Sequence, residues 1–385
     1  MKLKKILAVA LLAVSAMGFQ IANAQSLSPS TKWHWDKGTI VIDTPERPAG
    51  QEHVLGLTAA PVKTVRIGFV GLGMRGPSAV IRFCQIPGVK IVALCDYEEK
   101  RAEAQQRHLC NAGLAPAAIY YGEKGYEELC KRPDVDLIYI ATDWNHHFPV
   151  AKCAMENGKH AAIEVPSAMN LEQCWNLIDL SEKTRLHCFI LENCCYDDYE
   201  MKSLLMAQDG VFGEVIRAEG AYIHELSEFW KYYWKDPNDN DKDNLHWRMK
   251  YNMENRGDLY ATHGLGPVAQ CMDIHRGDRF TTLIAMDTES FAGKEWVKKN
   301  TGKESEEFRN GDHTTTLMRT AKGKVVEIQH NVMTPQPYNR LFKLTGTKGY
   351  ATKYPTEEFA IAGDALTGTD APKMDNINAH GFLNA

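Results

Sequence analysis

The stretch Thr64-Val-Arg-Ile-Gly-Phe-Val-Gly-Leu-Gly-Met-Arg-Gly76 decides the fold of the first half of the chain. Its apolar, β-branched beginning predicts a buried strand, and apolar residues at helical spacing follow over residues 78–84. A second apolar strand, residues 89–96, ends at Asp96, 20 residues after the last glycine. A strand before the glycines, a helix after them and an acid at this distance together indicate a dinucleotide-binding βαβ unit.

The three glycines of this GxGxxG motif are expected to have different roles. Gly71 permits a tight turn, Gly73 lets the backbone approach a pyrophosphate, and Gly76 allows the helix to pack closely on the sheet. The pyrophosphate is expected at the helix N-terminus, where unpaired amides and the helix dipole favour an anion. Asp96 would accept hydrogen bonds from ribose hydroxyls and repel a 2′-phosphate, so the predicted cofactor is NAD rather than NADP. A glycine turn without a ligand is the alternative reading.

Strands and helices continue to alternate after this unit. Helices are expected over residues 148–157, closed by Gly158, and 171–183. Further strands are predicted over residues 136–142, 160–164 and 188–192. Such alternation predicts a parallel, doubly wound sheet that binds ligands beyond the carboxyl ends of its strands. We assign residues 63–192 to this Rossmann domain.

The pattern changes after Asn193 to one that favours an antiparallel sheet. Residues 215–223 alternate as a strand should, and residues 314–319 and 324–330 are expected to be neighbouring strands. A helix is predicted to open within residues 256–267 and to end near residue 273, and one more strand is predicted over residues 341–345. Residues 193–385 are therefore assigned to a second α/β domain with an open, mainly antiparallel sheet.

The N-terminus has the pattern of a secretory signal peptide. A basic start, an apolar run too short to cross a bilayer and the small-x-small sequence Ala22-Asn-Ala24 predict cleavage before Gln25. A buried N-terminal helix is the alternative. The expected location is the periplasm or the outside of the cell, with no membrane partner. Residues 25–62 would form an N-terminal arm ahead of the Rossmann domain.

Composition argues against several classes of partner. The net charge is -5, 24% of residues are charged and no long basic run occurs, which argues against nucleic acid. The ten cysteines include no CxxC pair and no Cys/His spacing typical of zinc, so no metal site is expected and most cysteines should be small buried side chains. The sequence leaves open whether disulfides form and whether the chain is a homo-oligomer.

Three segments of the first domain resemble the glucose-fructose oxidoreductase/inositol dehydrogenase superfamily. They are Ala141-Thr-Asp-Trp-Asn-His-His147, residues 154–160 and Glu164-Val-Pro166. The resemblance implies a Rossmann domain paired with a second α/β domain whose open sheet carries the substrate. In most dehydrogenases of the superfamily the tripeptide is Glu-Lys-Pro, and the lysine works at the oxidised hydroxyl. Val165 cannot transfer a proton, which argues against an ordinary dehydrogenase.

The second domain departs from the dehydrogenase pattern in the same direction. His263 matches the superfamily's substrate-site histidine, but the aspartate expected four residues earlier is Leu259. The Glu-Val-Pro tripeptide and four segments of the second domain are similar to glycoside hydrolase family 109, the NAD-dependent α-N-acetylgalactosaminidases. The four segments are Asn193-Cys-Cys-Tyr196, Trp247-Arg248, Tyr260-Ala-Thr-His263-Gly-Leu-Gly-Pro and Gln336-Pro-Tyr338. The similarity covers about residues 47–352.

This second resemblance implies site residues one by one. Besides the three glycines of the motif, the implied NAD contacts are Met74, Arg75, Asp96, Trp144, Asn145, His146, His147, Glu164, Val165 and Asn193. The implied substrate contacts are Tyr222, Arg248, Tyr260, Ala261, Thr262, His263 and Tyr338. The implied partner is a glycan with a terminal N-acetylgalactosamine, and that sugar rests on the resemblance alone. The adjacent histidines 146 and 147 could be mistaken for metal ligands, but a cofactor-facing or helix-capping loop is favoured.

The implied reaction needs no pair of carboxylates. The sugar is oxidised by NAD at C3, loses a proton from C2 and the aglycone from C1, adds water and is reduced again. His263 suits acid–base work at the C3 hydroxyl because a histidine pKa lies near 6.5. Tyr260 or Tyr196 would carry the other proton steps, although a tyrosine pKa near 10 requires a cation such as Arg248 to stabilise the anion. Packing is the alternative role for Tyr260, and a surface ion pair for Arg248.

Two other functions stay open. An exported NAD-dependent sugar dehydrogenase would build up NADH. A truncated, non-catalytic binding remnant would bind NAD or sugar without turnover, since family members normally continue into further helices while residues 373–380 show no packing period. The aromatic segment 232–247 could be a platform for a sugar ring or a packed loop.

Overall fold

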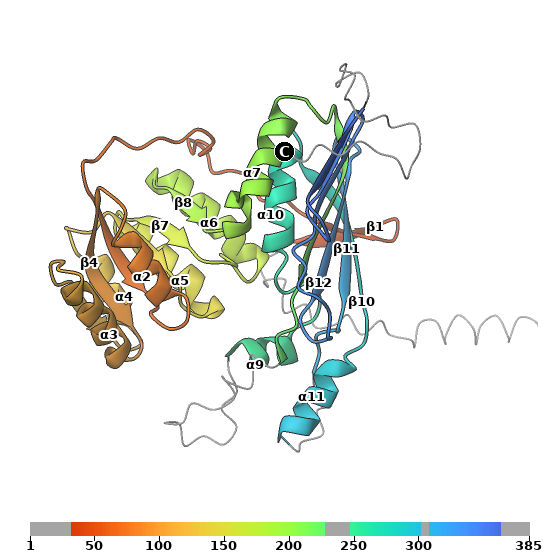
Figure 1. Cartoon of the computed structure of the whole chain (residues 1–385). Helices are drawn as coiled ribbons and strands as arrows, with labels where there is room; N and C mark the ends of the chain where they lie inside the picture. The colour runs from red at the N-terminus through yellow and green to blue at the C-terminus, as the bar shows by residue number, and fades with distance from the viewer. Residues whose placement is uncertain (1–31, 228–246, 302–307, 363–385) are drawn as a thin grey trace, which may run out of the picture. The chain divides into compact units, whose positions relative to one another are not determined.

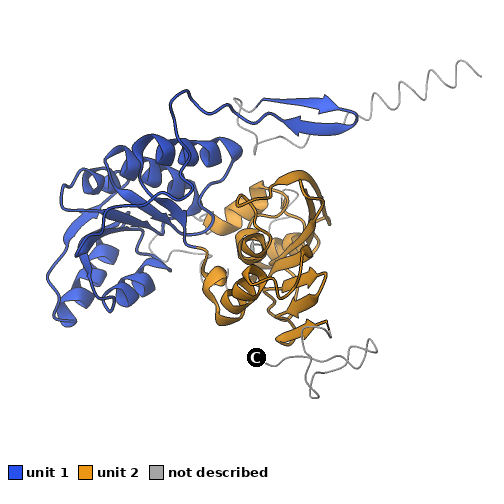
Figure 2. Ribbon diagram, turned by 90° about the horizontal axis from the view of Figure 1, so that it is seen from above, with its two compact units in different colours: residues 1–191 blue, residues 192–385 orange. Residues whose placement is uncertain are grey.

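The computed structural model describes residues 32–227, 247–301 and 308–362. The chain divides into two compact units between Leu191 and Glu192, coloured blue and orange in Figure 2. The sequence places this boundary one residue later. The predicted signal peptide, residues 1–24, lies outside the described residues, as do residues 232–246 of the aromatic segment and the whole of the tail over residues 373–380.

The first unit contains a six-stranded sheet in which every neighbouring pair is parallel. Its order is β5-β4-β3-β6-β7-β8, the doubly wound order that reverses between β3 and β6. The strands are β3 (Val65–Val70), β4 (Val89–Asp96), β5 (Ala118–Tyr121), β6 (Leu137–Ile140), β7 (His160–Ile163) and β8 (Cys188–Ile190). The predicted Rossmann sheet is confirmed.

Helices cover both faces of this sheet (Figure 1). They are α2 (Gly76–Phe83), α3 (Glu99–Asn111), α4 (Gly125–Cys130), α5 (Trp144–Glu156) and α6 (Leu171–Thr184). Successive side chains of a strand alternate between faces, so Ile138 and Ile140 pack with α4, α5 and α6, while Tyr139 packs with α2 and α3. The predicted helix over residues 148–157 begins earlier because the Asp143 side chain caps α5 by accepting from the Asn145 amide.

The segment ahead of the Rossmann sheet begins with a hairpin of β1 (Trp33–Asp36) and β2 (Thr39–Ile42). Farther along, the Arg47 guanidinium donates to both carboxylate oxygens of Glu182 at 2.9 and 3.0 Å. Gln51 donates to the same carboxylate at 2.9 Å. Since Glu182 is buried in α6, these bonds tie the arm predicted over residues 25–62 to the first unit.

The second unit contains a seven-stranded sheet of order β10-β11-β12-β9-β13-β14-β15. Its strands are β9 (Val215–Ile223), β10 (Phe280–Asp287), β11 (Thr314–Thr320), β12 (Val325–Asn331), β13 (Phe342–Gly346), β14 (Gly349–Thr352) and β15 (Glu358–Ile361). Neighbours are antiparallel except β12 and β9, which are parallel. The mainly antiparallel sheet is confirmed, including the predicted pairing of residues 314–319 with 324–330.

One face of this sheet is covered by helices, and the other is open near its β10 edge, where Ile284 and Met286 of β10 and Leu317 of β11 are exposed. The helical elements are η1 (Asn193–Tyr196), α7 (Asp198–Gln208), α9 (Trp247–Glu254), α10 (Thr262–Cys271) and α11 (Ala292–Thr301). Helix α10 approaches β9 at two glycines: a Cβ on Gly220 would lie 2.2 Å from the Gly264 carbonyl oxygen. This close approach places the first turn of α10 directly against the sheet.

All ten cysteines carry free thiols, and five of them are buried. The expectation that most are buried is therefore only half met. Cys110 and Cys174 are exposed because they lie on the solvent side of α3 and α6. In the three described ranges, no helix has both the length and the apolar character that a membrane span requires.

Candidate active site

The glycine turn of the first unit has the geometry of a cofactor cradle. Gly71 has φ +92°, and a Cβ there would lie 2.4 Å from the Ala141 carbonyl carbon. A Cβ on Gly76 would lie 2.1 Å from the Gly71 oxygen, so neither position accepts a side chain. A Cβ on Gly73 would meet only the Arg101 guanidinium, at 3.7 Å. The backbone at Gly73 therefore faces open space, as the approach of a pyrophosphate requires.

Asp96 shapes the same turn. Its carboxylate is buried and accepts from the Leu72 amide at 2.6 Å and from the Glu98 amide at 2.9 Å. Arg101 lies 3.5 Å from the same carboxylate. A carboxylate has about four lone-pair sites, so these bonds leave acceptor capacity for ribose hydroxyls. The bond to Leu72, which links β4 to the glycine turn, is not foreseeable from the motif.

The other predicted cofactor residues of the first unit gather at the carboxyl ends of β3, β6 and β7. Met74 and Arg75 are exposed in the glycine turn, and Asn145 and His146 are exposed in the first turn of α5. Glu164 follows β7 and accepts from the Tyr139 hydroxyl at 2.6 Å. Those with buried side chains are Trp144, His147 and Val165.

The His147 side chain is buried within this group and contacts two backbone carbonyls. Its Nδ1 lies 2.6 Å from the Pro166 carbonyl oxygen and its Nε2 lies 3.1 Å from that of Thr142. Burial lowers the pKa of this imidazole, and the two carbonyls oppose the shift. The ring therefore joins the segments after β6 and β7 through the backbone. His146 instead lies outside, with its Nδ1 2.5 Å from Asp143.

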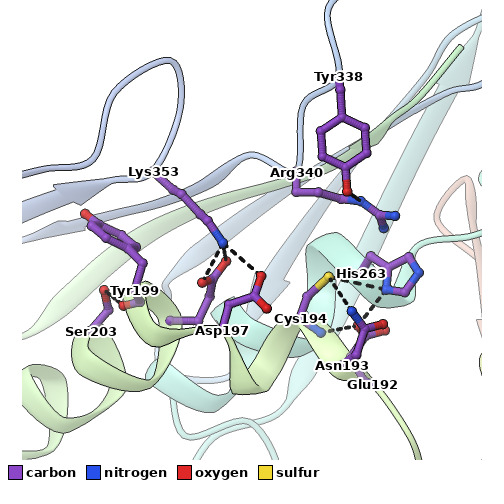
Figure 3. A network of polar contacts seen from close by, with 11 residues as sticks. Glu192, Asn193, Cys194, Asp197, Tyr199, Ser203, His263, Tyr338, Arg340 and Lys353 are labelled. Carbon is purple, nitrogen blue, oxygen red and sulfur yellow. Dashed lines mark hydrogen bonds and ion pairs between the residues drawn. The ribbon is translucent and has the colours of Figure 1, made fainter. Parts of the chain in front are cut away.

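In the second unit, His263 is the centre of a compact aromatic and polar cluster. It lies in the first turn of α10 and is 4% exposed. Its Nδ1 is 2.6 Å from Oε1 of Glu192 (Figure 3). The ring of Tyr260 lies 4.8 Å away between ring centres, and that of Tyr222 lies 5.4 Å away.

Two arginines flank these rings. Arg248, from α9, donates to the Tyr222 hydroxyl at 3.3 Å, and its guanidinium lies 4.7 Å from the centre of the Tyr260 ring. Arg340 lies 4.1 Å from the centre of the Tyr222 ring and donates to the Tyr338 hydroxyl at 2.6 Å. Both positive charges favour negative charge on a tyrosine or on a bound ligand.

The protonation states in the cluster follow from burial and charge. Burial lowers the pKa of His263; Glu192 opposes this shift, and the positive charges of Arg340 and Arg248 add to it. Burial by itself would raise the pKa of Glu192, but the hydrogen bonds from His263 and from the Cys194 amide, with the charge of His263 when that ring is protonated, outweigh it and the pKa is lowered. At neutral pH, Glu192 is therefore ionised and His263 is a neutral imidazole.

The structure thus brings together five of the predicted substrate residues: Tyr222, Arg248, Tyr260, His263 and Tyr338. Ala261 and Thr262 begin α10 immediately before the histidine. Tyr196 is different: it is 69% exposed at the end of η1, and within the described ranges no hydrogen bond or ring contact joins it to the cluster. Asn193, predicted to contact NAD, belongs to the second unit and is exposed.

Three residues of the cluster were not predicted from the sequence. Glu192 was assigned to the end of a strand, although β8 ends at Ile190. Arg340 lies in the segment before β13. His224 follows β9, with its Nδ1 3.5 Å from the Tyr222 hydroxyl. The signal in the sequence that could have indicated Glu192 and His224 is their position, since both follow the carboxyl end of a strand.

The donor atoms of Glu192, Cys194 and His263 lie within 4.8 Å of one another, a grouping that could hold a metal ion. Sequence spacing did not suggest it. Two zinc ligands at tetrahedral angles are about 3.4 Å apart, given ordinary ligand distances, whereas Glu192 Oε1 and His263 Nδ1 are 2.6 Å apart. Burial also raises the pKa of the Cys194 thiol to about 12, which opposes the thiolate that a metal prefers. The distances favour a hydrogen-bonded group.

Comparison with known proteins agrees with both units. Residues 65–191 match the oxidoreductase family with an NAD-binding Rossmann fold, and residues 196–371 match the C-terminal domain of glycosyl hydrolase 109. Glycosyl hydrolase family 109 protein 3 of Phocaeicola vulgatus is 78% identical over 100% of this chain and 69% of its own length. Protein 5 of the same family and organism is 68% identical over 94% of this chain and 70% of its length.

Solved structures share the fold at low sequence identity. The myo-inositol dehydrogenase of Lactobacillus casei, solved with NAD(H) and myo-inositol, is 19% identical with a TM-score of 0.55, over 75% of this chain and 74% of that one. The first unit is thus an NAD-binding domain, which confirms the predicted cofactor, and the glycine cradle fits it. With a relative 78% identical over the whole of this chain, the chain belongs to glycosyl hydrolase family 109.

Proposed function

We propose that the protein is a glycosidase that releases terminal α-linked N-acetylgalactosamine by transient oxidation of the sugar at C3. Family membership supports a glycosidase, and the Rossmann domain supports a reaction that uses NAD. When bound, NAD supplies a hydride acceptor and later a hydride donor, so the net reaction is hydrolysis.

The observation that carries the proposal is the environment of His263. A neutral imidazole, paired with a buried carboxylate, lies beside two tyrosines and near two arginines. This set of groups can move protons to and from hydroxyls and carbon acids. In the first unit, the position that a lysine occupies in dehydrogenases is the buried Val165, so proton transfer is assigned to the second unit.

Each proton step has a candidate group in the cluster. His263 accepts the proton of the C3 hydroxyl as that carbon is oxidised. Tyr260 removes the C2 proton, which the C3 ketone has made acidic, and Arg248 at 4.7 Å stabilises the phenolate. The aglycone leaves C1 with the electron pair of the C1–O bond as the C1–C2 double bond forms, and it takes a proton from water. Water then adds to C1 while a proton returns to C2, and the return of the hydride to C3 and of the proton from His263 to its oxygen restores the hydroxyl. Tyr196 is the second candidate for the tyrosine role.

The test is a chromogenic α-N-acetylgalactosaminide offered to the full chain with and without NAD, with aglycone and NADH measured together. We expect NAD-dependent release without accumulation of NADH, and loss of release in His263→Ala. NADH formed in proportion to substrate would instead establish the alternative, a sugar dehydrogenase. Absence of release from folded, NAD-loaded protein would exclude this sugar as the substrate.

We also propose that the protein is exported, with action in the periplasm or outside the cell. The support is the signal-peptide pattern of residues 1–24 and the cleavage sequence before Gln25. N-terminal sequencing of the protein recovered from fractionated cells should begin at Gln25. Recovery in the cytoplasm with residue 1 retained would contradict export.

A further inference from the structure

Glu192 and His263 form a buried carboxylate–histidine pair. The side chain of His263 is 3% exposed and that of Glu192 is 6% exposed. The pair joins the segment before η1 to the first turn of α10, across 71 positions of sequence. Oε1 of Glu192 lies 2.6 Å from Nδ1 of His263, a short distance for a bond between nitrogen and oxygen.

The carboxylate is itself held in place. The Cys194 amide donates to the same Oε1 at 3.0 Å, so the backbone of η1 fixes the oxygen that faces the imidazole. Gly266, one turn along α10 from the histidine, leaves room for the glutamate: a Cβ there would lie 2.9 Å from Glu192 Cγ. Both η1 and α10 therefore help to fix the contact between Glu192 and His263.

This contact decides which nitrogen of His263 carries the proton. An ionised carboxylate only accepts hydrogen bonds, so Nδ1 must be the protonated nitrogen of the neutral ring. Nε2 then keeps its lone pair. In Figure 3 the second ring nitrogen lies on the side of the imidazole away from Glu192. It is the nitrogen that can accept a proton from a ligand.

We propose that Glu192 is a positioning residue that holds His263 as the Nδ1-protonated tautomer and so presents Nε2 as the base for the sugar hydroxyl. This inference rests on the proposed function for its reaction, but the tautomer is a property of the protein alone. During the step, the O–H bond of the C3 hydroxyl breaks and its proton bonds to Nε2. The hydride from C3 goes to NAD, and Glu192 stays ionised beside the imidazolium.

The kinetic test is Glu192→Gln, which keeps the shape of the side chain and removes its charge. We expect kcat to fall about 10²-fold or more with little change in KM, as for the loss of the partner of a general base. Because the carboxylate opposes the lowering of the His263 pKa, its loss should also move the acidic limb of the kcat/KM profile to lower pH.

Glu200→Gln is the matched control. Glu200 is also a buried glutamate of the second unit, but it bonds to Lys353 rather than to the cluster. This variant should lose stability and keep the wild-type pH profile. A Glu192→Gln enzyme with wild-type kcat and an unmoved acidic limb would overturn the proposal.

The structural test does not depend on activity. Nitrogen-15 NMR of histidine-labelled protein, with the His263 signal assigned from its absence in His263→Asn, reports the tautomer directly. We expect Nδ1–H in the wild type and a shift towards Nε2–H in Glu192→Gln. Finding Nε2–H in the wild type overturns the proposal, whatever the substrate. An inactive wild type with the expected tautomer would refute the proposed function and support the role of Glu192.

Discussion

Replacing Lys353 by methionine should destabilise the second unit strongly. The ammonium of Lys353 donates to Asp197 at 3.0 Å (Figure 3). It also donates to both oxygens of Glu200 at 2.8 Å. Glu200 is 3% exposed. Lys353 follows β14, whereas Glu200 lies in α7, so the bonds join the sheet to the helix that covers it.

The magnitude follows from the charge that the substitution would leave behind. Removing one partner of a buried ion pair costs about 3–5 kcal/mol, because the other charge stays buried without compensation. In a domain of this size, that loss corresponds to a Tm lower by roughly 6–20 °C. For comparison, Lys131→Met breaks an exposed pair with Glu128 and should change the stability far less.

The loss should also depend on pH. Burial raises the pKa of Glu200 above its usual 4.5, and Lys353 opposes the shift, so Lys353→Met raises the pKa further. The folded variant then binds more protons than the unfolded chain at every pH between the two pKa values. Its stability should therefore fall as pH rises through that window, by up to about 1.4 kcal/mol per pH unit.

The assay is urea denaturation of the full chain, wild type and Lys353→Met, followed at several pH values above 4.5. The double variant Lys353→Met, Glu200→Gln should recover most of the loss, because no buried charge remains. A loss below about 1 kcal/mol, or one that does not vary with pH, would refute the reasoning.

Three further predictions follow from single contacts. Gly73→Ala should keep the wild-type Tm but bind NAD at least about tenfold more weakly. Gly76→Ala should lower the Tm because its Cβ would lie 2.1 Å from a backbone oxygen. Calorimetry measures the NAD affinity and thermal melts measure the Tm; equal changes of both quantities in the two variants would contradict the roles assigned to these glycines. Arg340→Met removes a charge that lowers the pKa of His263, so the acidic limb of kcat/KM should move to higher pH, opposite to Glu192→Gln. Treatment with EDTA should leave activity unchanged, and a loss that Zn²⁺ restores would instead assign the group of Glu192, Cys194 and His263 to a metal.

Local signals were sufficient for the Rossmann unit. The strands and helices predicted within residues 65–190 lie within a few positions of their predicted limits because each βα unit is short and has its own apolar period and caps. The parallel, doubly wound arrangement followed from the alternation of strands and helices, not from any pairing signal in the sequence. No range was predicted for β1, β2 and β5, which are four residues each and mostly exposed or half-buried, or for the helices α3 and α4.

The second unit was harder because its contacts are long-range. Nothing local indicates that β9 pairs in parallel with β12, more than 100 residues away. The same limit applies to the site. Tyr260 and Tyr196 are equivalent in the sequence, and only the folded chain shows that Tyr260 faces His263 while Tyr196 is exposed. The partnership of Glu192 with His263 depends on the meeting of η1 and α10.

The central claim is that the glycosidic bond is broken by elimination after oxidation, and deuterium tests it most directly. The full chain would be incubated with NAD and an α-N-acetylgalactosaminide in D₂O, and the released sugar examined by proton NMR. The account predicts deuterium at C2, where the base exchanges the proton, and none at C3, where the original hydride returns. Release of a sugar that keeps protium at C2 would contradict it.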